Sequence, residues 1–386
     1  MGGREEIEYG RQADLRGHQL ANCALGALLA CGGPDVAAIS LPDPDDIDRC
    51  PDPGPGVEIG GFTGTGADTH RIPQRRLVLM GGGREEDVAA RLFVEASVAG
   101  DVVVLRTSGS LTSYPEYFIG TLASITPSTV ITVRTSDPEA GADPAVLCRV
   151  GRAEAVWLAG GNQWNYLGRW PAELHDSLAA VAERDATMGG TSAGAVSLGE
   201  GAFDAQYGTV TSEEALADPL RREVSISRPV FAQPELEGVL VDSHFMDRER
   251  EGRLLAFLAR FLADRGEGPV VGVGLDEGAA LTLEVGEYQV TSRGSGAAWL
   301  YEVTGPATLT PGVPLSLDGI RRVRLPGGRV GRWPFDFDAS GDVQVLHVDR
   351  GEVVSGPRQA RFTRPSLPRS SRSRPPPRFG SRAAPP

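Results

Sequence analysis

Apolar runs alternate with segments of helical spacing along the chain between residues 76 and 195. The runs lie at 76–83, 101–110, 128–136, 154–163 and 186–195. The first four are followed by segments with helical character, at 84–100, 114–125, 143–153 and 164–185. Strands that are apolar on both faces are typical of a parallel sheet covered by helices on both sides. The pattern therefore predicts an α/β fold with a doubly wound, mostly parallel sheet.

Shorter alternating segments with glycine turns follow in the C-terminal third of the chain, at 287–305 and 342–355. Their period of two residues is typical of strands that are half buried. We expect a C-terminal β extension that extends or flanks the sheet and ends near residue 355. Residues 71–356 are accordingly assigned to one folded domain.

Both ends of the chain differ from this domain in composition. Residues 32–70 are rich in Pro, Asp and Gly and are predicted to be a linker, and residues 357–386 are rich in Arg, Pro and Ser and are predicted to be a disordered tail. The segment 1–31 contains an apolar run that ends at Cys31. Two interpretations stay open for that segment: a lipoprotein signal with a lipid on Cys31, or an amphipathic leader.

The two interpretations of the leader place the protein in different compartments. A lipidated Cys31 would place it in the cell envelope, and a cleaved signal would make it a secreted protein; an uncleaved leader would leave it in the cytoplasm. Glu5, Glu6 and Glu8 stand where a signal would carry positive charge. The apolar run is too short to cross a membrane, and we expect no transmembrane segment elsewhere.

Composition and charge exclude several classes of function. The net charge of -13 argues against a nucleic-acid partner. The chain has no lysine, which excludes a Schiff-base mechanism. The five histidines lack the spacing of metal ligands, and the four cysteines form no C-x-x-C pair, so we expect neither a metal nor a disulfide framework. The glycines at 81–83 lack the G-x-G-x-x-G spacing, and we expect no cofactor.

Ser192 is the candidate nucleophile, because it lies in a G-x-S-x-G motif at the predicted carboxyl end of a strand. A serine needs a base and a group that orients the base. His244 follows the apolar run 238–241 and is the best base. Glu277 is the preferred acid, next to Asp276 after another apolar run. Backbone N–H groups of Ala193 and Gly161 are the candidates for stabilising an oxyanion.

The order of these residues along the chain is serine, histidine, glutamate. The α/β-hydrolases carry their triad in the order serine, acid, histidine. The sequence therefore predicts a serine hydrolase that is not a standard esterase or lipase of that fold.

Four motifs together resemble cyanophycinase and its relatives in the S51 serine peptidase family, at 158–163, 189–195, 241–260 and 273–281. The resemblance implies a class I glutamine amidotransferase-like fold, usually dimeric, for the domain at 71–356. It also implies that Ser192, His244 and Glu277 are the catalytic triad. The substrate pocket that it implies contains six residues: Gln163, Asp242, Ser243, Arg248, Arg250 and Arg253.

The family's reaction is hydrolysis of an aspartyl peptide bond through an acyl-enzyme, which releases β-aspartyl-arginine from an Asp/Arg polymer. The chain departs from the family pattern at Ser243, where the family has glutamine, and at Asn162, where it has aspartate. Two alternatives to the polymer substrate therefore stay open: an aspartyl or isoaspartyl dipeptidase, and a non-catalytic envelope binding protein. The three arginines also fit the solvated face of an amphipathic helix.

Overall fold

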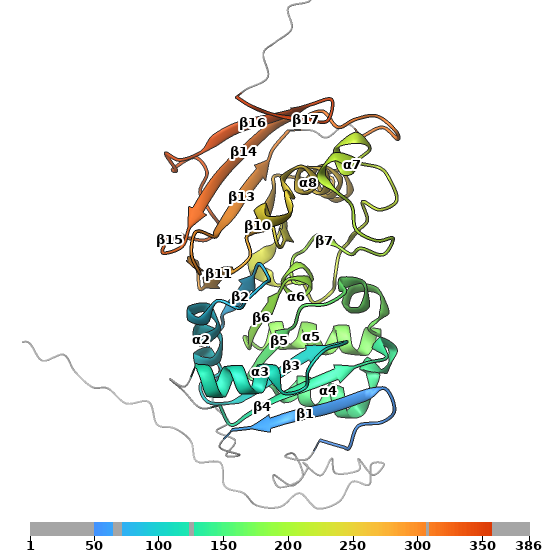
Figure 1. Cartoon of the computed structure of the whole chain (residues 1–386), viewed down its shortest axis with the longest axis vertical. Coiled ribbons are helices and arrows are strands. Elements are labelled where there is room, and N and C mark those ends of the chain that lie inside the picture. Colours follow the sequence, from blue (N-terminus) through green and yellow to red (C-terminus); the bar gives the residue numbers. More distant parts are fainter. Residues whose placement is uncertain (1–49, 65–71, 123–126, 306–308, 357–386) are drawn as a thin grey trace, which may run out of the picture. The chain divides into compact units, whose positions relative to one another are not determined.

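The computed structural model describes residues 50–64, 72–122, 127–305 and 309–356, all within a compact unit that begins at Arg49. The segment 1–31 with Cys31 and the tail at 357–386 lie outside the described residues. The described residues form two large sheets and the helices that cover them (Figure 1).

The first sheet has nine strands and a parallel centre. Its parallel strands lie in the order β4 (Thr129–Thr135), β3 (Asp101–Arg106), β5 (Ala155–Leu158), β6 (Thr187–Thr191) and β2 (Leu77–Met80). Antiparallel strands extend both edges: β1 (Val57–Thr63) beside β4, and β11 (Ala279–Glu284), β12 (Glu287–Ser292) and β15 (Val330–Arg332) beyond β2. The predicted doubly wound, mostly parallel sheet is confirmed.

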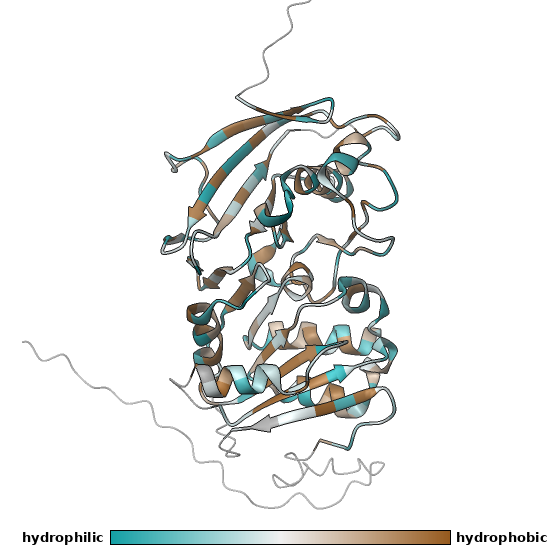
Figure 2. Cartoon of the chain, in the orientation of Figure 1, coloured by the Kyte–Doolittle hydropathy of each residue, from teal (hydrophilic) through white to brown (hydrophobic). Residues whose placement is uncertain are grey.

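Helices cover both faces of this sheet because successive apolar side chains of its strands point to opposite faces. Leu77 and Leu79 of β2 pack into the core cluster that includes α4 (Pro144–Arg152) and α5 (Ala172–Glu183). Val78 and Met80 point the other way, into the cluster of α2 (Asp87–Ala96). In Figure 2 apolar residues run along these strands. Burial on both faces explains why the strands read as continuous apolar runs.

The second sheet has six strands and includes the predicted C-terminal extension. Its strands lie in the order β17 (Glu352–Ser355), β16 (Gln344–Asp349), β14 (Leu317–Pro326), β13 (Ala297–Val303), β10 (Val270–Leu275) and β9 (Val239–Asp242). Only β9 and β10 run parallel within it. The long helix α8 (Glu251–Arg265) packs on this sheet. The strand before His244 thus belongs to the second sheet, and not to the parallel sheet that carries Ser192.

Short elements complete the described structure. They are α3 (Ser113–Glu116), α6 (Ala193–Val196), α7 (Ser212–Ala217), β7 (Ala202–Phe203), β8 (Ile226–Ser227), the 3-10 turns Pro138–Ala142, Pro234–Leu236 and Met246–Arg248, and the π-helical turns Tyr117–Thr121 and Asn165–Arg169.

The N-terminal part of the described chain differs from the sequence expectation in two ways. Strand β1 lies inside the segment 32–70, which we predicted as linker, and pairs antiparallel with β4. Cys50 forms a disulfide with Cys148 of α4, 98 residues away along the sequence. We expected no disulfide framework from the cysteine pattern, and this bond departs from that expectation. Partners so far apart leave no spacing signal, because only the fold brings them together.

Candidate active site

Ser192 lies on a sharp turn between β6 and α6. Its backbone has φ 51° and ψ −118°, a conformation that is unfavourable for a residue with a side chain. The Ser192 N–H donates to the Met80 carbonyl oxygen at 3.0 Å, which ties the turn to β2. A Cβ on Gly194 would lie 2.0 Å from the carbonyl oxygen of Leu158. The flanking glycine is thus required by close packing, and the G-x-S-x-G motif here forms the tight turn that was predicted for a nucleophile elbow.

His244 follows β9 and reaches across to Ser192. Its Nε2 lies 2.8 Å from Ser192 Oγ. The His244 backbone is held in place by an N–H donated to the Gly81 carbonyl oxygen at 2.7 Å, with φ at 48°. His175 and His347 make other contacts, to backbone oxygens of Tyr166 and Gly356. The structure therefore brings the predicted base and the predicted nucleophile into direct contact.

Glu277 completes a continuous chain of hydrogen bonds. Its Oε1 lies 2.5 Å from His244 Nδ1. The neighbouring Asp276 points elsewhere and accepts from the backbone N–H groups of Met246 and Ala297. Asp247, which the sequence analysis did not single out, accepts the Glu277 N–H at 2.7 Å and so fixes the acid. No sequence signal separated Asp247 from the surrounding charged residues of its motif.

The surroundings of His244 favour its neutral form. Burial lowers the pKa of His244, and the hydrogen bond that His244 donates to Glu277 opposes this effect. The positive charges of Arg248 and Arg250 lower the pKa further. A neutral imidazole with its proton on Nδ1 leaves Nε2 free to accept the Ser192 hydroxyl proton. The arrangement is that of a general base and the group that orients it.

The turn at 160–161 lies beside the nucleophile. A Cβ on Gly160 would be 3.5 Å from Ser192 Cβ, and one on Gly161 would be 3.2 Å from the Tyr166 hydroxyl oxygen. Ala193 is the first residue of α6, where backbone N–H groups have no partner within the helix. The proposed oxyanion donors, Gly161 and Ala193, thus lie on the two segments that approach the serine, and their role stays a prediction.

Asp242 and Arg253 pair with each other inside the protein. Arg253 donates from Nε to Asp242 Oδ2 at 2.8 Å and from Nη2 to Oδ1 at 2.5 Å. The two side chains are only 2% and 3% exposed, and the guanidinium lies over Phe203 and Phe257. Both groups were expected in the substrate pocket. The structure buries them in the core instead, because Arg253 is on the inward face of α8.

The other four expected pocket residues differ in accessibility. Ser243 is buried, and its carbonyl oxygen accepts from Arg250 Nη1 at 2.6 Å. Burial lowers the pKa of Arg250 to about 10, although Asp242 is near. The Gln163 side-chain amide donates to the Phe203 carbonyl oxygen at 3.3 Å. Arg248 is 53% exposed, with Nη2 3.7 Å from Glu277 Oε1. Arg248 therefore presents a cation to solvent directly beside the triad.

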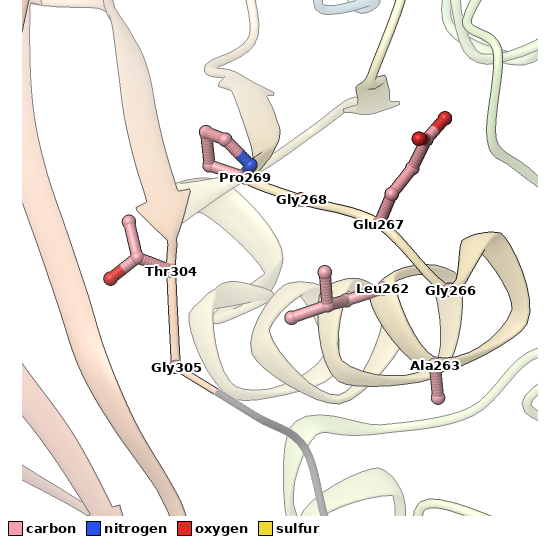
Figure 3. A pocket seen from close by; sticks show the side chains of 8 residues that line it. All are labelled: Leu262, Ala263, Gly266, Glu267, Gly268, Pro269, Thr304 and Gly305. Carbon is pink, nitrogen blue, oxygen red and sulfur yellow. The ribbon is translucent and has the colours of Figure 1, made fainter.

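A separate open pocket of 490 Å³ lies at the C-terminal end of α8, and no triad residue lines it (Figure 3). Its lining residues are Leu262, Ala263, Gly266, Glu267, Gly268, Pro269, Thr304 and Gly305. Within the described ranges, no three His, Cys, Asp or Glu side chains gather where they would hold a metal ion. None of the helices that the structure describes is long and apolar enough to cross a membrane.

Two curated proteins named cyanophycinase match the sequence. They come from Synechococcus elongatus and Thermosynechococcus vestitus, and each is 32% identical to this chain over 154 residues. The match covers 39% of this chain and 42% of each relative, so the chain spans about two fifths of the length of the curated relatives it matches. No protein-family model matches the sequence. The resemblance to cyanophycinases that the four motifs indicated is confirmed over this stretch.

Two solved structures are more distant neighbours. A peptidase from an acI-B1 Actinobacterium superposes with a TM-score of 0.45 at 14% identity, covering 68% of this chain and 98% of that one. A putative peptidase E protein from Listeria monocytogenes EGD-e superposes with a TM-score of 0.33 at 13% identity, covering 57% and 99%.

Proposed function

We propose that this chain is a serine-type peptidase of the S51 kind. The observation that carries the proposal is the unbroken hydrogen-bonded series from Ser192 Oγ through the His244 imidazole to Glu277 Oε1. The similarity to cyanophycinases supports the same activity. A serine hydroxyl on a strained turn, with a neutral imidazole as base and a carboxylate behind it, is equipped for nucleophilic attack on a carbonyl.

The proposed reaction has two stages. Ser192 Oγ attacks the carbonyl carbon of the scissile amide while His244 Nε2 takes the hydroxyl proton. The N–H groups of Ala193 and Gly161 stabilise the oxyanion, and His244 returns the proton to the leaving amine. Water then attacks the acyl-enzyme with His244 again as base, and Ser192 is regenerated. Glu277 stabilises the imidazolium in both stages.

The proposed substrate class is an amide that follows an aspartyl residue, with the Asp/Arg polymer cyanophycin as first candidate. Arg248 would pair with a substrate carboxylate at the mouth of the site, because its guanidinium is exposed and near the triad. Asp242 and Arg253 would act by holding the His244 turn, since each already satisfies the other. An aspartyl or isoaspartyl dipeptidase is the alternative, because Ser243 shortens the side chain that the family carries there.

The compartment and assembly are also proposals. The Cys50–Cys148 disulfide supports the envelope or secreted alternative, because such bonds form and persist in oxidising compartments. A homodimer is proposed from the family resemblance alone.

The deciding experiment is release of β-aspartyl-arginine from purified cyanophycin by the wild-type protein and by Ser192→Ala. Ser295→Ala is the matched control, because Ser295 is an exposed serine outside the triad. We expect release from the wild type and the control, and none from Ser192→Ala. Labelling of Ser192 by a fluorophosphonate without release would favour the dipeptidase. Neither labelling nor release would favour the non-catalytic binding protein.

A further inference from the structure

The loop between β2 and α2, residues 81–86, lies next to His244, Glu277 and the residue that precedes Ser192. Gly82 packs against the His244 ring, where an added Cβ would lie 2.4 Å from Cε1. Gly83 lies beside Glu277, with an added Cβ 3.1 Å from Oε2. The Gly278 N–H donates to the Gly82 carbonyl oxygen at 3.0 Å. One short loop therefore sets the positions of both the base and the acid.

Glu85 extends the same loop toward the nucleophile. Its Oε1 accepts from the Tyr114 hydroxyl at 2.5 Å. Its Oε2 and the Thr191 hydroxyl oxygen are both shielded from solvent, and within the described part of the chain neither meets a partner in full hydrogen-bond geometry. The two groups are close enough for the Thr191 hydroxyl to act on the pKa of Glu85. Thr191 is the residue immediately before Ser192.

The raised pKa of Glu85 favours a protonated carboxyl, which can donate to Thr191. Burial raises the pKa of Glu85, and the hydrogen bond that the Tyr114 hydroxyl donates opposes this effect only in part. A protonated carboxyl accepts on one oxygen and donates from the other. It would accept from Tyr114 and donate to Thr191. This arrangement would satisfy both of the oxygens that otherwise lack a partner, which buried polar groups require.

Other charged groups around Glu85 are already engaged. The Arg293 Nε donates to the Glu85 backbone oxygen at 2.8 Å, and the Arg293 guanidinium also pairs with Asp87. Arg106 lies 5.8 Å from the centre of the Tyr114 ring. The Glu85 carboxyl thus has no ion-pair partner among the described residues, and its hydrogen bond is with the Tyr114 hydroxyl.

We propose that Glu85 is a positioning residue for the nucleophile: held by Tyr114, its carboxyl fixes Thr191 and thereby the strained backbone of Ser192. The inference rests on the proposed serine-peptidase function. A strained backbone persists only when its surroundings over-determine it. Thr191 is the last residue of β6, directly before Ser192, and its side chain is buried. The loop would then fix the positions of all three triad residues relative to one another.

The test measures the rate at which a fluorophosphonate labels Ser192, which needs no knowledge of the natural substrate. The variants are Glu85→Ala, Glu85→Gln and Thr191→Val, with Glu116→Gln as the matched control on the exposed side of α3. We expect Glu85→Ala and Thr191→Val to label about tenfold more slowly, because a small displacement of the nucleophile costs reactivity. Glu85→Gln should label at nearly the wild-type rate, since its amide also accepts from Tyr114 and donates to Thr191.

Each outcome decides a different question. Labelling of Glu85→Ala and Thr191→Val at the wild-type rate would overturn the positioning role, and so would a Glu85→Gln variant as slow as Glu85→Ala. If Glu85→Ala does not fold, Thr191→Val decides alone, because valine has nearly the shape of threonine. Equal labelling of the wild type and Ser192→Ala would overturn the proposed function itself, and the inference with it. Where substrate turnover is measurable, kcat should fall with KM unchanged.

Discussion

Gly82 and His244 are in contact so close that no side chain fits between them. A Cβ on Gly82 would lie 2.4 Å from His244 Cε1 and 2.6 Å from His244 Nε2. Nε2 is the atom that forms the hydrogen bond with Ser192 Oγ. Gly82 also has φ at 92°, where residues with a side chain are strained. The imidazole of the proposed base thus packs directly on the backbone of the loop after β2.

Gly82→Ala should therefore abolish most of the activity. The added methyl group would push the imidazole away from Ser192 Oγ, and a displacement of this size costs about 100-fold in rate. Fluorophosphonate labelling measures the loss. Gly208→Ala is the control, because Gly208 has φ at 98° but nothing within 4 Å of its added Cβ. Equal losses in both variants would mean that backbone strain, and not contact with His244, is responsible.

The activity should rise with pH through a midpoint below the ordinary histidine pKa of about 6.5. The base must be neutral, and burial lowers the pKa of His244, so the neutral form persists to more acidic pH. Arg248→Gln removes a positive charge that contributes to this lowering, and the midpoint of kcat/KM should move up by a few tenths of a pH unit. The shift is small because Arg248 is half exposed and water screens its charge. A downward shift, or an equal shift in Arg169→Gln, would contradict this account.

Asp242→Asn should destabilise the protein. The change leaves the Arg253 guanidinium buried without its counter-charge, which costs about 3–5 kcal/mol of the free energy of unfolding. The midpoint of urea unfolding measures this effect, with Arg248→Gln as an exposed control that should change stability by less than about 0.5 kcal/mol. If Asp242 instead bound substrate directly, Asp242→Asn would raise KM with the urea midpoint unchanged.

Cys50→Ser should lower stability by about 4–5 kcal/mol on the chain-entropy model, because the lost cross-link closes a loop of 98 residues. Denaturant unfolding of the variant and the wild type gives the difference, and Cys148→Ser should behave identically. Mass spectrometry after alkylation without reductant checks the bond itself. Modification of both Cys50 and Cys148 in the native protein under those conditions would rule out the disulfide.

Much of the fold and of the triad follows from local patterns. The apolar runs predicted the strands of the parallel sheet because burial on both faces requires apolar residues at consecutive positions. Ser192 lies at the end of one such run, and His244 and Glu277 come within three residues of the ends of other apolar runs, so their placement near strand ends was readable from the sequence. The structure brings them within hydrogen-bond distance.

The features that the sequence did not reveal depend on contacts between distant segments. Strand β9 looks like another buried strand, and nothing in its residues indicates that it joins β10 in a second sheet. Asp242 and Arg253 were expected in the substrate pocket because they match pocket positions of the family that the motifs resemble. Their mutual burial becomes apparent only when α8 folds back over β9. The role of Gly82 likewise depends on a histidine more than 150 positions away.

Ser192 follows a strand of the first sheet, and His244 follows a strand of the second. The proposed reactivity of Ser192 therefore requires that the two sheets are docked. The turn around Glu277 is one of several chain connections between them, since it joins β10 of one sheet to β11 of the other. The reactivity of Ser192 toward a labelling reagent should therefore report on the formation of tertiary structure. During refolding, the rate at which a reagent labels Ser192 would rise when the two sheets dock. A measurement of secondary structure would not detect that step.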